Sequence, residues 1–292
     1  MTASLNRVLV TGAAGRIGRA TLDVLAASGI TATALVLDDP GDLLADRVVV
    51  GSATDPAAVG EAMSGVDGVI HLAAIPVPDR NPPQEVFGGN TLATFTVLDE
   101  AGRAGVAHTV IASSYAATGL PFSRADRHPE YVPVDVAMPA QVEDPYGLSK
   151  QTDELTAAMM VRRYGMSLAA LRYPFVGGIG DRLSEHAALL AAQPGAGSRD
   201  MWAYLDTRDA ARAALLALQV DVSEALVAYV AAPRTLSPYP TEDLLRRFHP
   251  GVTHYGPALP GRTVPLDLSD AREVFGFTAE FEYEVAERPL PE

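Results

Sequence analysis

The sequence contains no cysteine, and this absence excludes several kinds of chemistry at once. Without a thiol there can be no disulfide framework, no thiolate nucleophile and no zinc or iron–sulfur cluster bound through cysteine. The six histidines are scattered and lack the spacing of a metal-binding motif. We therefore expect no metal site.

Positive charge is scarce as well. The chain has 36 acidic and 22 basic side chains, which gives a formal net charge of −14 at pH 7. A surface of this sign repels nucleic acid and anionic membranes, so we expect neither as a partner. No apolar run approaches the roughly 18 residues of a membrane span. The first residues enter a strand pattern directly, without the regions of a secretory signal, and we expect a cytoplasmic protein.

Lysine is the rarest charged residue, since Lys150 stands alone beside 21 arginines. It ends the stretch YGLSK, four residues after Tyr146. A bias in base composition explains why lysine is rare, but it does not explain the position of the one that remains. Ten of the 292 residues are tyrosines, so chance alone would place a single lysine four residues after a tyrosine about 3 times in 100.

Strand-like and helix-like segments alternate along the first three quarters of the chain. Continuous runs of Val, Ile and Leu are typical of parallel strands that are buried on both faces. We predict an α/β fold, a Rossmann-like doubly wound parallel sheet with a smaller C-terminal substrate-binding cap. Residues 1–170 are predicted to form the domain that contains this sheet and 171–292 mostly the cap, with about 171–177 and 203–220 returning to the core. Strands are expected at 7–15, 31–39, 46–55, 67–74, 108–114 and 167–178, and helices at 16–29, 90–105, 146–165 and 208–220.

A glycine-rich turn, TGAAGRIG, separates the first expected strand from the first expected helix. Its glycines, Gly12, Gly15 and Gly18, let a backbone approach a pyrophosphate at the start of that helix. Asp38 follows Gly18 by 20 residues and ends the second strand, where a carboxylate can bind the ribose of adenosine. Because the 2′-phosphate of NADP would be repelled there, we predict NAD as the cofactor rather than NADP.

Tyr146 and Lys150 lie four residues apart on an expected helix and therefore project from one face. A tyrosine phenol ordinarily has a pKa of about 10 and is a poor base near neutrality. A nearby ammonium favours the phenolate, which could then take a proton from a substrate hydroxyl while its carbon gives hydride to NAD. Ser113 and Ser114 end the strand before this helix, and either could hydrogen-bond the reacting oxygen.

Taken together, these motifs resemble the extended short-chain dehydrogenase/reductase family, of the NAD-dependent epimerase/dehydratase type. The resemblance spans about residues 7–220. It rests on TGAAGRIG, LD at Asp38, HLAA at 71–74, Asn90, SSYAATG from Ser113, YGLSK, LRYPFVGG and YLDTRDAARAALLAL.

The resemblance implies Ser114 as the donor to the substrate oxygen, Tyr146 as the base and Lys150 as its partner. Ser114 is preferred to Ser113 because it stands five residues before Gly119, as in the family's pattern. The family also implies a homodimer that pairs the helix after Asn90 with the Tyr–Lys helix. The implied cofactor contacts are Gly12, Gly15, Arg16, Ile17, Gly18, Asp38, Ala73, Tyr146 and Lys150, with Tyr173 or its neighbours.

The predicted reaction is hydride transfer between NAD and a hydroxyl or carbonyl of a sugar-like substrate, preferably a free sugar or a uronate. The short cap and Phe175, where nucleotide-sugar epimerases often have Asn, favour this over the alternative of a nucleotide-sugar epimerase or dehydratase that retains NAD. A non-catalytic NAD-sensing regulator is less favoured, because such relatives tend to lose the Tyr or Lys. Candidates for binding a diphosphate or carboxylate are Arg172, Arg182, Arg199, Arg234 and Arg262. The Pro-rich segment 120–145 is predicted to line or cover the substrate entrance.

Overall fold

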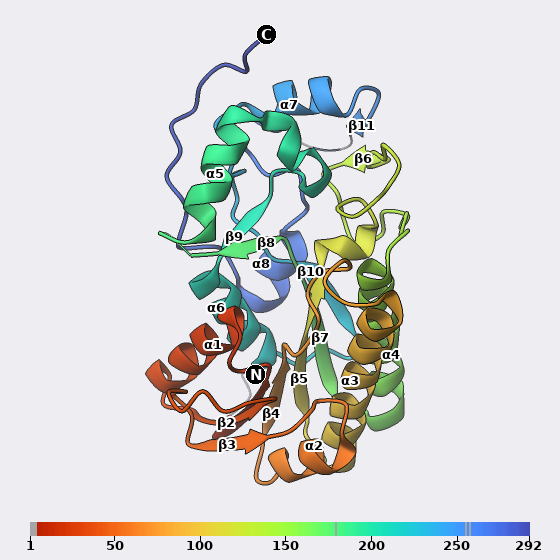
Figure 1. Cartoon of the computed structure of the whole chain (residues 1–292), viewed down its shortest axis with the longest axis vertical. Coiled ribbons are helices and arrows are strands. Elements are labelled where there is room, and N and C mark those ends of the chain that lie inside the picture. The colour runs from red at the N-terminus through yellow and green to blue at the C-terminus, as the bar shows by residue number, and fades with distance from the viewer. Residues whose placement is uncertain (1–4, 179, 255, 257) are drawn as a thin grey trace.

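The runs of Val, Ile and Leu form one parallel sheet of seven strands in the computed structural model, which describes residues 5–178, 180–254, 256 and 258–292 (Figure 1). The strand order is β10-β7-β5-β4-β1-β2-β3. This order confirms the predicted Rossmann-like fold class. The strands are β1 (Arg7–Thr11), β2 (Thr31–Val36), β3 (Arg47–Val50), β4 (Gly68–His71), β5 (His108–Ser114), β7 (Ser167–Tyr173) and β10 (Leu226–Tyr229).

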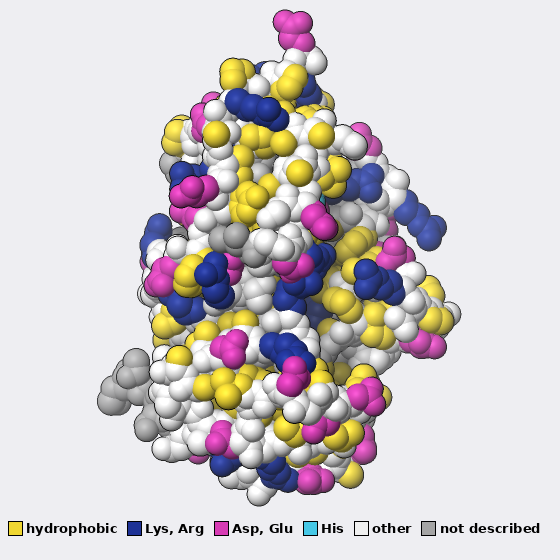
Figure 2. All heavy atoms as spheres, turned by 60° about the vertical axis from the view of Figure 1, so that its left-hand side comes forward, with side chains coloured by type: hydrophobic (Ala, Val, Ile, Leu, Met, Phe, Trp, Pro, Cys, Tyr) yellow, Lys and Arg dark blue, Asp and Glu magenta, His cyan; other side chains and the backbone are white. Residues whose placement is uncertain are grey.

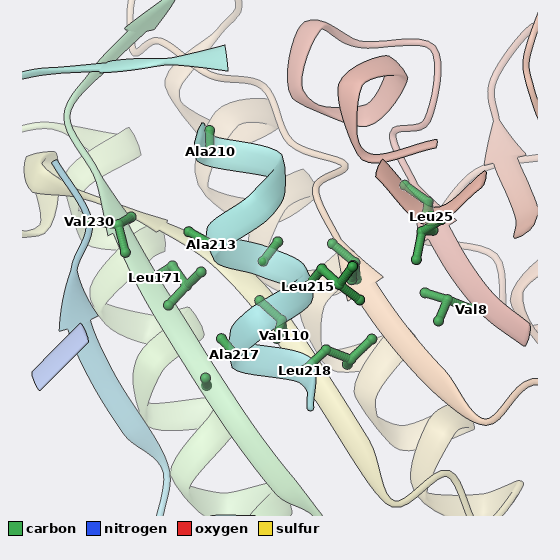
Figure 3. Close-up of a cluster of buried hydrophobic side chains, with 14 of the residues drawn as sticks. Val8, Leu25, Val110, Leu171, Ala210, Ala213, Leu215, Ala217, Leu218 and Val230 are labelled. Atoms are coloured by element: carbon green, nitrogen blue, oxygen red, sulfur yellow. The ribbon is translucent and has the colours of Figure 1, made fainter. Parts of the chain in front are cut away.

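Helices cover both faces of the sheet, as the side chains of β1 illustrate. Val8 packs in one cluster with Leu25 of α1 (Arg16–Ala27) and Leu218 of α6 (Thr207–Leu218) (Figure 3). Leu9 points to the opposite face, because side chains alternate along a strand, and packs in a cluster with Val97 of α3 (Pro83–Arg103). All five side chains are buried. Because both faces of this strand are buried, every one of these positions needs an apolar side chain, and the sequence is an unbroken apolar run.

Helices α1, α6 and α8 cover one face, and α2, α3 and α4 cover the other. The strand order reverses between β4 and β1, and such a switch point leaves a crevice at the carboxyl ends of the strands. None of the described helices is long and apolar enough to cross a membrane. The helices are α1 (Arg16–Ala27), α2 (Pro56–Ala62), α3 (Pro83–Arg103), α4 (Pro145–Tyr164), α5 (Arg182–Ala192), α6 (Thr207–Leu218), α7 (Thr241–Phe248) and α8 (Ser269–Phe275), with 3-10 turns η1 (Tyr115–Thr118) and η2 (Pro194–Asp200).

A second core lies above the carboxyl ends of the strands, in the upper part of Figure 1. It contains Trp202, Tyr239 and Leu244, and it draws on segments far apart in the sequence. Strand β6 (Tyr131–Val132) pairs with β11 (Thr253–His254), which ties part of the Pro-rich segment 120–145 to this cap. Strands β8 (Phe175–Gly177) and β9 (Tyr204–Asp206) form another small sheet between cap and core.

The chain returns to the core more often than the sequence indicates. Helix α6 packs on the sheet within the predicted returning segment 203–220. Strand β10 and helix α8 return as well, and α8 packs against β10. Both fall in a stretch that the sequence assigns mostly to the cap, since LVAY is a short run among prolines. The division at residue 170 stays a prediction.

Candidate active site

A cavity of about 800 Å³ opens at the carboxyl edge of the sheet, beneath the cap. The loops after β1, β4 and β5 line it from the core side, and the segment after β7 lines it from the cap side. Pro121 and Phe122, at the start of segment 120–145, line it too. That this segment lines or covers a substrate entrance stays a prediction. The predicted site residues on its wall are Gly12, Gly15, Arg16, Ile17, Gly18, Ser113, Ser114, Tyr146, Lys150 and Tyr173.

The glycine loop is shaped by close approaches of the backbone. Gly12 has a φ of 66°, and a Cβ there would lie 2.8 Å from the backbone nitrogen of Ala73. A Cβ on Gly18 would lie 2.3 Å from the Gly12 carbonyl oxygen. Gly15 is the N-cap residue of α1 and has no side chain to cap the helix, and like the other two glycines it lines the cavity. The start of α1 therefore offers free backbone N–H groups to an anion, and the loop fits a dinucleotide pyrophosphate.

Two predicted cofactor contacts lie off the cavity wall. Ala73 sits between the lining residues Leu72 and Ala74, and its N–H donates to the Thr11 hydroxyl at 3.3 Å. Asp38 is exposed, two residues beyond the end of β2, and it is not among the lining residues. Its proposed contact with a ribose stays a prediction.

Helix α4 carries Tyr146 and Lys150 at its first two turns. Asp144 caps the helix by accepting a hydrogen bond from the Gly147 N–H at 2.8 Å, and Pro145 occupies the first turn. Tyr146 is 9% exposed, and the Lys150 ammonium nitrogen lies 5.8 Å from the centre of its ring. Phe122 contacts the Tyr146 ring edge-on at 6.0 Å between ring centres. The predicted pair therefore shares one wall of the cavity.

Lys150 is held by two acceptors. Its ammonium donates to the Ala112 carbonyl at 2.9 Å and to Oδ2 of Asp153 at 3.1 Å. Burial lowers the pKa of Lys150, but Asp153 and the other anionic neighbours outweigh burial and raise the pKa above its ordinary value. The sequence analysis missed Asp153, although an acid three residues after Lys150 on one helix face is a readable signal.

The two serines at the end of β5 have different partners. Ser113 is buried and donates to Oε1 of Glu154 at 2.6 Å. Ser114 accepts a hydrogen bond from the Ala116 N–H at 3.1 Å, which caps η1 and leaves its hydroxyl hydrogen for another acceptor. This arrangement favours Ser114 as the donor to a substrate oxygen.

Asn90 fixes the loop after β4 beside the same helix. Its amide oxygen accepts from the Ile75 N–H at 2.8 Å, and its amide nitrogen donates to the Ser149 hydroxyl at 3.1 Å.

His71 is buried between the hydroxyls of Thr11, at 2.7 Å, and Thr94, at 3.3 Å. Burial, together with the positive Lys150, lowers the pKa of His71 to about 3. His71 is therefore neutral and structural.

Of the five arginines offered by the sequence as anion ligands, Arg182 lines the cavity. Arg172 instead forms a buried ion pair with Glu154 at 2.8 Å, which joins β7 to α4. Arg199 donates to the Ser123 carbonyl, Arg234 pairs with Glu282, and Arg262 donates to the Thr235 carbonyl.

Two further arginines accompany Arg182 on the cavity wall, Arg16 and Arg80. Burial, followed by the charges of Arg16 and Arg80, lowers the pKa of Arg182, and Asp181 opposes this. Asp181 also forms an ion pair with Arg16, which links the glycine loop to the start of α5. Figure 2 shows Lys and Arg side chains at mid-height of one face of the molecule, with Asp and Glu side chains beside them. The three arginines give the cavity wall positive charge that can attract an anion, although the whole chain has a net charge of −14.

Asp200 is a second acid that the sequence analysis missed. It lines the cavity, and neither a hydrogen bond nor an ion pair engages its carboxylate among the described residues. Burial raises the pKa of Asp200 to about 6, against a smaller opposing effect of Arg199. The next two residues, Met201 and Trp202, are buried and have φ values of 53° and 51°, which are strained for non-glycine residues. No local sequence signal reports this turn.

The described residues contain no group of three or more His, Cys, Asp or Glu side chains placed to hold a metal ion.

A family model described as the NAD dependent epimerase/dehydratase family matches residues 8–230. The chain belongs to this family. The family resemblance predicted from the motifs is thereby confirmed.

Individual relatives in the family differ in what they do. The uronate dehydrogenase of Pseudomonas syringae pv. tomato is 29% identical over 174 residues, which are 57% of this chain and 58% of that protein. The UDP-glucose 4-epimerase of Corynebacterium glutamicum is 28% identical over 243 residues, which are 73% of this chain and 71% of that protein. A crystal structure of a short-chain dehydrogenase/reductase superfamily protein from Agrobacterium tumefaciens with bound NAD has a TM-score of 0.70 and 25% identity, over 94% of this chain and 93% of that chain. The predicted enzyme class and the predicted cofactor are those of the family.

Proposed function

We propose that this protein is an NAD-dependent oxidoreductase that transfers hydride between NAD and a hydroxyl-bearing carbon of a free sugar or uronate. The observation that carries the proposal is that Ser114, Tyr146 and Lys150 line one cavity with the glycine loop. A base, an oxygen ligand and an anion-binding helix start are therefore within reach of one bound molecule.

Each residue has one role in the oxidative direction. The Tyr146 phenolate takes the proton of the substrate hydroxyl, and the Lys150 ammonium stabilises the phenolate before the transfer. Ser114 donates a hydrogen bond to the same substrate oxygen. NAD held by the glycine loop would supply the hydride acceptor for the substrate carbon that becomes the carbonyl carbon.

The chain's own residues are proposed to hold the cofactor in the orientation that this chemistry needs. The start of α1, with Gly15, Arg16 and Ile17, binds the pyrophosphate. Asp38 accepts hydrogen bonds from the adenosine ribose and disfavours NADP by charge repulsion. Gly12 and Gly18 keep the loop close enough to the sheet for this contact.

The positive charge at the mouth of the cavity supports an anionic substrate such as a uronate. Arg80 and Arg182 are the lining groups that could pair with its carboxylate, in addition to Arg16. The similarity to the Pseudomonas uronate dehydrogenase supports the same substrate class.

A nucleotide-sugar epimerase or dehydratase that retains NAD is the second candidate. The match to the Corynebacterium epimerase covers a larger share of the chain than the match to the uronate dehydrogenase, 73% against 57%. The same arginines could bind a diphosphate. The two candidates differ in a measurable way, because a dehydrogenase releases NADH and an epimerase does not.

The test measures NADH formation by absorbance at alkaline pH, with NAD and NADP separately, over a panel of free aldoses, uronates and UDP-sugars. We expect NADH from one class of free sugar or uronate, and a preference for NAD. The Tyr146→Phe and Lys150→Met variants should lose about 10²- to 10⁴-fold in kcat/KM.

Tyr164→Phe is the matched control, since it removes one hydroxyl from the other end of α4, where that hydroxyl donates to Asp99 at 2.7 Å. Its turnover should stay within about twofold of the wild type. Interconversion of UDP-sugars without NADH release would replace the proposal by the epimerase alternative.

A further inference from the structure

The lone lysine is not a free cation beside the phenol but half of a buried ion pair. Lys150 is 4% exposed and Asp153 is 1% exposed. Their contact joins the ammonium to Oδ2 at 3.1 Å within one turn of α4. The other carboxylate oxygen, Oδ1, is buried without a hydrogen-bond partner among the described residues. Asp153 therefore directs its charge at Lys150.

Groups from every neighbouring element face this pair. On α4 itself, Tyr146 and Glu154 raise the pKa of Lys150 less than Asp153 does. His71 of β4 is neutral, and on β5 the Ala112 carbonyl accepts from the ammonium. Burial raises the pKa of Asp153, and the Lys150 charge followed by the hydroxyl of Thr94 on α3 opposes this rise.

The remaining charge near the pair is already compensated. Arg172 of β7 is bound by both carboxylate oxygens of Glu154, at 2.8 Å each. Glu154 is therefore engaged with an arginine, whereas Asp153 is the acid that contacts the ammonium.

We propose that Asp153 is a positioning residue for Lys150, which fixes the ammonium against β5 and moderates the positive charge that reaches the Tyr146 phenol. The proposal rests on the proposed function of Tyr146 as the base. A bare ammonium at this place would lose its proton readily, because burial disfavours a charge without a counterion. With Asp153 the ammonium keeps both its proton and its position.

The proposal predicts that two proton equilibria, those of Lys150 and of Tyr146, both move to lower pH in Asp153→Asn. Asn keeps the shape of the side chain but removes the charge, so Lys150 should lose its proton at lower pH than in the wild type. While Lys150 remains charged, its uncompensated field favours the Tyr146 phenolate more strongly. The acid limb of the activity profile should therefore move to lower pH, and an alkaline limb should follow it downward.

The first measurement needs neither substrate nor cofactor, because Lys150 is the only lysine in the chain. The folded protein is labelled briefly with acetic anhydride at a series of pH values, and modification of the Lys150 ε-amine is measured by peptide mass spectrometry. The α-amino group of the same chain is the internal reference. We expect the labelling midpoint of Asp153→Asn to lie at least about one pH unit below that of the wild type. At a pH below both midpoints, such a shift means that the fraction of Lys150 in the neutral amine form is about tenfold higher in the variant.

Two variants separate a charge effect from a change of packing. Asp153→Glu restores the charge and should bring the midpoint back toward the wild type. Asp99→Asn removes another largely buried carboxylate, which pairs with Arg103 at 2.8 Å, and should leave the midpoint unchanged. An unchanged midpoint in a folded Asp153→Asn protein, or an equal shift in Asp99→Asn, would overturn the proposal.

The second measurement is the pH profile of kcat/KM on whichever sugar the panel identifies. A profile that moves to lower pH at both limbs supports the proposal, and a uniform loss at every pH contradicts it. If no substrate is turned over, the proposed function fails while the labelling midpoint still decides whether Asp153 controls Lys150.

Discussion

Asp200 is a residue whose placement costs stability. Its carboxyl has a pKa of about 6 in the folded chain, against an ordinary value of 3.8, because it is half-buried at the cavity wall and loses much of its hydration there. The unfolded chain therefore releases this proton near pH 3.8 and the folded chain near pH 6. Between these values the folded state binds more protons, so the free energy of unfolding falls as the pH rises.

We expect Asp200→Asn to be more stable than the wild type at pH 7, and the difference to be smaller at pH 4. The gain in free energy of unfolding should be about 1–2 kcal/mol after allowance for the partial exposure of the side chain. Urea unfolding at pH 4, 5, 6, 7 and 8 measures it, with the exposed Asp39→Asn as the control. A difference that is the same at every pH would show that the carboxyl does not titrate in this way.

Residues within one motif were predictable, whereas residues brought together by the fold were not. Tyr146 and Lys150 share a helix face, so their spacing already fixes their relative position. Asp200 meets the cavity through a strained turn at Met201 and Trp202, which depends on packing in the cap and leaves no local signature. Arg80 likewise reaches the cavity from a loop that no sequence pattern assigns to it.

The glycine loop and the start of α1 act as one element. Gly15 and Gly18 lie one helical turn apart, but they face different neighbours. The space beside Gly18 is filled by the loop backbone at 2.3 Å, while the nearest atom to a Cβ on Gly15 is the Gly12 carbonyl oxygen at 3.1 Å. Both glycines line the cavity, but Gly18 is closely packed against the loop backbone, whereas Gly15 has more space beside it.

This difference gives a paired prediction. Gly18→Ala should lower the free energy of unfolding by about 1–3 kcal/mol or more, because backbone atoms must move. Gly15→Ala should unfold within a few degrees of the wild type but bind NAD about tenfold or more weakly. Thermal unfolding and titration of intrinsic fluorescence with NAD measure both quantities. If the Gly15→Ala protein binds NAD with unchanged affinity, the glycine loop is not part of the cofactor site.

At the level of elements, the long periodic segments were predictable and the short returning ones were not. The sheet through β7 follows from apolar runs and the glycine turn. Strand β10 is four residues long, and its identity as a strand depends on pairing with β7. Helix α8 packs against β10 and joins the same core cluster, so both elements depend on contacts that a local pattern does not contain.

On the whole molecule, the outer face of α3 and α4 carries several exposed apolar side chains. The two helices pack against each other, as Figure 1 shows, and leave Leu92, Phe95, Leu148 and Leu155 exposed by 45–70%. Exposed apolar groups gathered on a helix pair are typical of an interface. They support the homodimer that the family resemblance implies.

We expect the protein to be a dimer in solution, and Phe95→Glu combined with Leu155→Glu to convert it to a monomer. Light scattering coupled to size-exclusion chromatography measures the mass, for which one chain is 30.7 kDa. Leu37→Glu, at another exposed apolar residue away from this face, is the control and should leave the mass unchanged. If the wild-type protein has the mass of a single chain, the prediction of a homodimer is wrong.

The repeated passage of the chain between cap and core has a consequence for any attempt to divide the protein. A fragment that stopped at residue 170 would cut β7 before its last three residues and would lack α6, β10 and α8. The face of the sheet that holds Val8 and Val10 would lose most of the helices that pack on it. Strand β7, without β10, would become an edge strand with unpaired backbone N–H and C=O groups. The core and the cap are therefore separate in space, but neither is encoded by one continuous stretch of the sequence. A recombination event at residue 170 would transfer neither of them as a unit that folds. Evolutionary change in the cap is therefore expected to occur by substitutions and insertions in the loops of an intact chain.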